Sequence, residues 1–72
     1  MLTVAEKVEI VYKVLVSYDY QQDVAREFRV SRHVVQALIN KTRKKKGFID
    51  ELIASRDLKE QQRQTIIKYL EE

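Results

Sequence analysis

The chain has 72 residues, of which 44% are hydrophobic and 35% are charged, and its net charge is +3 at pH 7. This length allows one small domain, or a piece of a larger chain, with a core of modest stability. The absence of cysteine excludes disulfides and thiolate metal sites, and it fits a reducing, intracellular compartment. No apolar run approaches the roughly 20 residues of a membrane helix, so we expect no membrane partner.

The composition predicts an all-α fold, because the chain has no proline and one glycine. The first helix is expected to begin after Thr3, whose hydroxyl forms a capping box with the carboxylate of Glu6. An apolar stripe at helical spacing follows and predicts the buried face of this helix. The stripe comprises Val4, Val8, Val11, Leu15 and Tyr18, and it is broadened by Ile10 and Val14.

Residues 23–41 have the apolar spacing of two short helices that meet at a sharp bend. The first is expected over residues 20–28, after a start signal at Asp19, and the second over residues 32–44. Ser31 is suited to cap the second helix, which places the bend at Arg29 and Val30. The faces expected to be buried comprise Val24, Ala25 and Phe28 on the first helix and Val35, Leu38 and Ile39 on the second.

A Val-Ala-x-x-Phe-x-Val-Ser run begins at Val24 and leads into the second of these helices. The pattern resembles the helix-turn-helix of homeodomain-like and transposase-type DNA-binding domains. The resemblance implies a trihelical bundle over residues 1–46, with the helix at 32–44 as its recognition helix. Arg29 stands where the family usually has glycine. Asn40 lies one position before the asparagine of the family's Trp-Phe-x-Asn run, so the family's adenine contact is not carried over.

The positive charge is concentrated in the predicted helix-turn-helix. Residues 1–20 carry a net charge of −1, residues 21–46 carry +6, and residues 47–72 carry −2. Six Lys or Arg and no acidic residue lie between Ser31 and Lys46. A uniformly positive field of this kind is suited to a polyanion, and it indicates double-stranded DNA as the partner.

The polar side of the predicted recognition helix carries candidate base-reading residues. Gln and Asn side chains pair bidentately with adenine, and Arg pairs with guanine. Any surface helix also presents polar residues to solvent, so an ordinary solvated face is the alternative interpretation. The base-reading candidates are Arg32, His33, Gln36 and Asn40, with Gln36 and Asn40 preferred.

Phosphate contacts are expected from the cations and from hydroxyl and amide groups near the bend. The run from Lys41 to Lys46 also fits a nuclear-import signal, or a solvated helix end whose cations favour the helix dipole. These three readings are compatible with one another. The phosphate candidates are Gln21, Arg29, Ser31, Lys41, Arg43, Lys44, Lys45 and Lys46.

Residues 47–72 are acidic and amphipathic, and we expect them to form a C-terminal helical extension to the domain at 1–46. Gly47 is placed to end the recognition helix in a left-handed cap. A short helix from Phe48 is expected to fold back on the bundle. The last helix, over residues 58–70, has its apolar residues at one end, which predicts a surface for a protein partner or a second copy. That surface comprises Ile66, Ile67, Tyr69 and Leu70.

Two functions follow from these features. The first is a nuclear DNA-binding module, and the second is an assembly subunit that docks through its C-terminal helices. By resemblance, the parent system is a transposase-derived DNA-binding protein or a homeobox-like accessory subunit of a DNA adenine methyltransferase complex. Catalysis is not expected, because the chain has one histidine, no cysteine and no phosphate-binding loop. We therefore expect no metal, cofactor or small-molecule substrate.

Overall fold

The structure is a computed structural model that describes residues 2–71, and these residues form five helices and no strand. The all-α class is therefore confirmed. No helix within residues 2–71 has the length and apolarity needed to cross a bilayer. The helices are α1 (Val4–Leu15), α2 (Gln21–Glu27), α3 (Arg32–Arg43), α4 (Phe48–Ala54) and α5 (Lys59–Glu71).

Helix α1 begins with the predicted capping box. The Thr3 hydroxyl accepts from the Glu6 N–H at 3.1 Å, and the Thr3 N–H donates to the Glu6 carboxylate at 2.9 Å. The predicted apolar stripe is wrong at both ends, because Val4 is 46% exposed and Tyr18 is 76% exposed. Tyr18 follows the end of α1 with a positive φ of 60°, which turns the chain away from the helix axis. Ile10 is buried as expected, and so is Tyr12, which the predicted stripe did not include.

Protonation of Glu6 is expected to weaken α1 at acid pH. The hydrogen bond from the Thr3 backbone, followed by the bond to the Thr3 side chain, lowers the pKa of Glu6 below its ordinary value. Because the folded-state pKa is the lower one, this stabilisation is present above the unfolded-state pKa and is lost as pH falls through the folded-state pKa. We therefore expect the urea midpoint to fall less between about pH 7 and about pH 3 in Glu6→Gln than in the wild type. Equal falls would contradict this role of Glu6.

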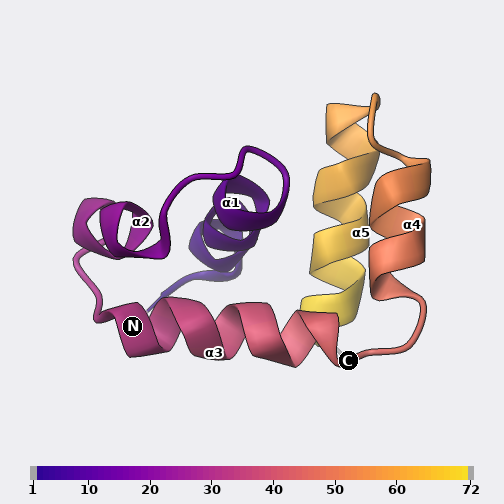
Figure 1. Ribbon diagram of the computed structural model, residues 1–72. Coiled ribbons are helices and arrows are strands. Elements are labelled where there is room, and N and C mark those ends of the chain that lie inside the picture. The colour runs from indigo at the N-terminus through magenta and orange to yellow at the C-terminus, as the bar shows by residue number, and fades with distance from the viewer. Residues whose placement is uncertain (1, 72) are drawn as a thin grey trace.

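Helix α5 packs along α1 and completes the core. Figure 1 shows α5 and α4 side by side, with α1 and α2 on the other side of the molecule and α3 running beneath both groups. Ile66 is fully buried, and the ring of Tyr69 meets the ring of Phe48 edge-on at 5.2 Å between centroids. The polar first half of α5 also contacts α1, because Arg63 forms an ion pair with Glu9 and lies over the ring of Tyr12.

The predicted partner surface on the last helix is therefore wrong. Ile66, Tyr69 and Leu70 are buried in the chain's own core, and Ile67 is half-buried against it. The physical reason is that the turn between α4 and α5 reverses the chain direction, so that the apolar end of α5 lies against α3 and α4 while its length covers α1. Residues 47–72 thus complete the hydrophobic core of residues 1–46, where the sequence predicted an extension.

The connection between α3 and α4 differs from its prediction in the role of Gly47. Helix α3 ends at Arg43 with Lys44 as its C-cap, so Gly47 does not cap α3 but leads into α4 with a φ of 85°. A Cβ added at Gly47 would also approach the Tyr69 hydroxyl to 3.3 Å. The Lys45 amine donates to the Tyr69 carbonyl at 2.7 Å, near the end of α5, where helical carbonyls lack intrahelical partners.

Candidate nucleic-acid interface

The turn between α2 and α3 holds the two helices at a sharp bend. Arg29 has a φ of 57°, a left-handed conformation that costs a residue with a side chain roughly 1 kcal/mol. Its N–H donates to the Arg26 carbonyl, and the Val30 N–H donates to the Ala25 carbonyl. The Ser31 hydroxyl then accepts from the Val34 N–H at 3.4 Å and caps α3, as the sequence predicted. Local hydrogen bonds therefore fix where α3 begins.

The start of α2 differs from its prediction. The helix runs from Gln21 to Glu27, and Tyr20 occupies the N-cap position without a side-chain hydrogen bond. The predicted start signal at Asp19 therefore does not operate as a cap. Asp19 instead donates its backbone N–H to the Lys13 carbonyl, in the loop that follows α1. This loop carries the positive φ of Tyr18, which redirects the chain before α2 can start.

Helix α3 buries one side and leaves the other open. Val35, Ile39 and Thr42 are buried, and Leu38 is half-buried beside them. Successive residues are rotated by about 100° around a helix, so the side opposite this core is centred on His33, Ala37, Asn40 and Lys44. All four are exposed. In Figure 1 the other four helices lie on one side of α3, and its opposite side faces solvent along its whole length.

The predicted base-reading residues share this open side and one of its flanks. His33 and Asn40 lie near its centre, whereas Arg32 and Gln36 lie on the flank next to α2. Arg32 and Gln36 line a shallow depression together with residues from the start of α2. The remaining lining residues are Tyr20, Gln21 and Gln22. Every side chain in this depression carries a hydrogen-bond donor, which suits an acceptor-rich surface such as a nucleic-acid backbone.

The predicted phosphate residues divide into an exposed group and two half-buried residues, Gln21 and Lys45. The first group is exposed, and within residues 2–71 none of its cations forms an ion pair with an acidic side chain. Its cations are Arg29, Lys41, Arg43, Lys44 and Lys46, and Ser31 is exposed beside them. Lys45 is half-buried, and its amine donates to the Tyr69 carbonyl. This bond gives Lys45 a role in the fold, and its contact with phosphate stays a prediction.

Arg43 lies apart from the centre of the open side. It lines a depression between the ends of α1 and α4, together with Val14 and Ile49 among others. Arg43 is four residues after Ile39, one helical turn further along, which places it on the same flank of α3 as Arg32 and Gln36.

The sequence interpretation missed Tyr20, which is 76% exposed in the depression at the start of α2. Its position could have been found from the sequence, because an aromatic residue stands there immediately before a short polar helix.

Residues 2–71 contain no group of three or more His, Cys, Asp or Glu side chains arranged to hold a metal ion. Comparisons of the chain with protein-family models, curated proteins and solved structures found no match.

Proposed function

We propose that this chain binds double-stranded DNA, with α3 in the major groove and α2 across the adjacent backbone. The observation that carries the proposal is the open side of α3, which is exposed along its length and continues into a basic run without an acidic residue from Ser31 to Lys46. An uncovered helix with this field matches the docking mode of a helix-turn-helix.

The sharp α2–α3 bend supports a homeodomain-like arrangement of α1, α2 and α3. Arg29 supplies the left-handed turn and Ser31 supplies the cap, the two features that a helix-turn-helix needs between its helices. In this arrangement the depression formed by Gln21, Arg32 and Gln36 borders the groove. Lys41, Lys44 and Lys46 contact phosphates and supply affinity, whereas Gln36 and Asn40 read base edges.

Gln36→Ala and Asn40→Ala are each expected to flatten base preference. Both side chains are exposed, so the substitutions should leave the fold intact. Selection of bound duplexes from a randomised pool, at one fixed salt concentration, measures the preference of each variant. A good bidentate contact contributes about 1–3 kcal/mol of discrimination at its base pair, so the preferred base should be lost at one position while non-specific affinity changes little. Equal loss of affinity for every sequence would assign these residues to phosphate contact and would contradict base reading.

The alternative function is an assembly subunit, but three of the four residues first predicted for its docking surface are buried. Ile66, Tyr69 and Leu70 are inside the core, so a partner cannot reach them. A protein-docking role would need another exposed apolar region.

A further inference from the structure

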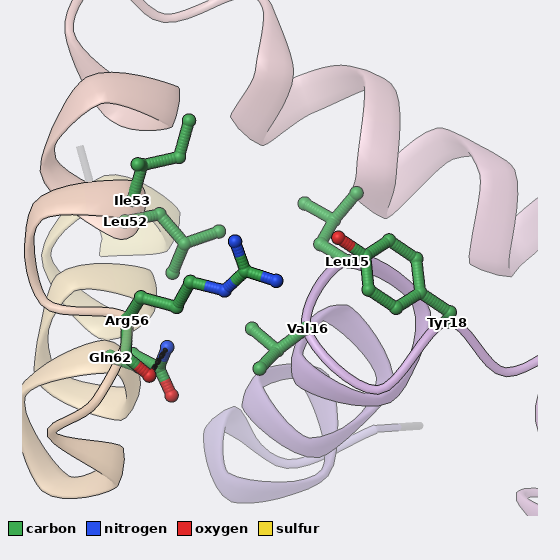
Figure 2. Close-up of a pocket in the computed structure, with 7 residues that line it drawn as sticks. All are labelled: Leu15, Val16, Tyr18, Leu52, Ile53, Arg56 and Gln62. Atoms are coloured by element: carbon green, nitrogen blue, oxygen red, sulfur yellow. Dashed lines mark hydrogen bonds between the residues drawn. The ribbon is translucent and has the colours of Figure 1, made fainter.

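An apolar groove runs between the C-terminal end of α1 and helix α4, on a different part of the molecule from the open side of α3. It consists of two adjoining depressions, and we call the whole the α1–α4 groove. One depression extends to Arg56 and Gln62, and the other extends to Arg43. Both are lined by Leu15, Tyr18, Leu52 and Ile53. Figure 2 shows the first depression, with α1 and α4 as its facing walls.

The walls of the groove carry large hydrophobic side chains that are exposed to solvent and are not part of the core. Tyr18 is 76% exposed and Ile53 is 61% exposed, from opposite walls. Tyr18 is also held at a positive φ of 60°, a conformation that disfavours a residue with a side chain. Strained residues of this kind persist where the surrounding structure requires them, and they concentrate at ligand-binding sites. An exposed aromatic residue on a strained turn therefore marks the rim of this groove.

A buried acceptor lies at the base of the first depression. Gln62 is 1% exposed, and its side-chain N–H group donates to the Arg56 carbonyl. Its Oε1 atom has no hydrogen-bond partner within residues 2–71. A buried carbonyl oxygen without a donor is costly, because it has lost its water without replacement. Figure 2 shows the Gln62 amide next to Arg56, whose side chain extends across the depression toward α1.

The charged residues that line the groove are both positive. Arg43 lies at one end and Arg56 at the other, and no acidic residue is among the described residues that line either depression. Within residues 2–71 neither arginine forms an ion pair. The first depression is open to solvent on one side and has a volume of about 170 Å³. A cavity of about 150 Å³ in another protein accommodates benzene, so this space admits one aromatic ring.

We propose that the α1–α4 groove binds an amphipathic segment of a partner protein, anchored by a Tyr or Trp side chain and flanked by acidic residues. The aromatic ring enters the first depression between Leu15 and Leu52, and its O–H or N–H donates to the Oε1 atom of Gln62. Acidic residues on either side of the anchor face Arg43 and Arg56. A purely apolar anchor would leave Gln62 without a donor, which is why Tyr or Trp is specified.

The test is a selection of random displayed peptides on the immobilised full chain, with counter-selection on Ile53→Asp. We expect enriched peptides to contain Tyr or Trp with Asp or Glu on both sides. A synthetic copy of the best peptide should bind Ile53→Asp at least roughly tenfold more weakly than the wild type. Leu58→Asp is the matched control, because Leu58 is 55% exposed, receives the same charge and lies outside the groove. It should retain the wild-type affinity, and circular dichroism should show both variants folded.

Two further measurements examine the anchor and the charge. Replacing the peptide's Tyr with Phe, or its Trp with a naphthyl residue, should weaken binding to the wild type roughly fivefold and binding to Gln62→Met little. Arg56→Glu should reverse the preference from acidic to basic flanks. The proposal is overturned if no peptide is enriched, if enriched peptides lack these features, or if Leu58→Asp loses as much affinity as Ile53→Asp.

Two controls separate the groove from other partners. Binding of anionic lipid vesicles that disappears in Ile53→Asp would overturn the proposal, because the occupant would be a membrane. Duplex DNA affinity should be equal in the wild type and Leu58→Asp, and Ile53→Asp should match them. Failure of DNA binding in all three would contradict the proposed function and leave the peptide result unaffected.

Discussion

Ile66→Ala is expected to remove a large part of the stability of this chain. Ile66 is fully buried between α5 and the rest of the core, and truncating such a residue costs about 2–5 kcal/mol. A chain of this length has a total stability of only about 4–11 kcal/mol, from about 0.05–0.15 kcal/mol per residue. Urea denaturation followed by circular dichroism measures the change. Ile53→Ala is the control, because Ile53 is 61% exposed and should change the free energy of unfolding by less than about 0.5 kcal/mol.

Removal of residues 47–72 tests the same core more severely. Truncation exposes the buried face of α1, including Ile10 and Val11, and also removes Phe48 and Tyr69. We therefore expect the fragment 1–46 to lose cooperative unfolding. A fragment 1–46 that unfolds cooperatively, or an Ile66→Ala variant with an unchanged urea midpoint, would contradict the shared core and restore residues 1–46 as an independent domain.

The second large expected effect is a steep decrease in the affinity for duplex DNA as the salt concentration rises. If about five cations contact phosphates, log K for duplex DNA should fall against log salt with a slope of about −4 to −5, which is roughly 500-fold between 50 and 200 mM. Lys41→Gln with Lys44→Gln removes two exposed cations from the open side of α3. This double variant should reduce the slope by about 1.8 and weaken binding roughly tenfold or more near 0.1 M salt.

A double variant with the same loss of charge provides the control. Arg56→Gln with Lys59→Gln also removes two exposed cations, but these lie at the junction of α4 and α5, away from α3. Its slope should remain within about 0.5 of the wild-type slope, because counterion release depends on local phosphate contacts. Equal effects of the two double variants would show that net charge alone determines binding, and the proposed DNA-facing side of α3 would lose its support.

Local signals in the sequence predicted the helical segments and the starts of α1 and α3. The capping box at Thr3 and the cap at Ser31 both form, and all three of their hydrogen bonds join residues three apart. Arg29 adopts a left-handed conformation at the bend, although this conformation disfavours a residue with a side chain. Interactions of this range depend on residue type and spacing alone, so the sequence contains the information needed to place them.

Contacts between distant helices could not be predicted in the same way. The apolar end of α5 indicated an external partner because its pattern does not specify which surface covers Ile66 or Leu70. Lys45 was grouped with its basic neighbours, and only the position of α5 shows that its amine meets the Tyr69 carbonyl. Tyr18 continues the apolar spacing of the first helix, but it follows the end of α1 at a positive φ of 60° and is 76% exposed.

The most direct test of the proposed DNA-binding side is a backbone amide NMR titration of the full chain with a short duplex at low salt. We expect the largest shift changes along the open side of α3, at His33, Gln36, Asn40 and Lys44, with further changes at Gln21, while amides around Ile53 and Arg56 remain unchanged. Absence of shifts at low salt, or shifts centred on α4 and α5 with α3 unaffected, would contradict DNA binding through α3.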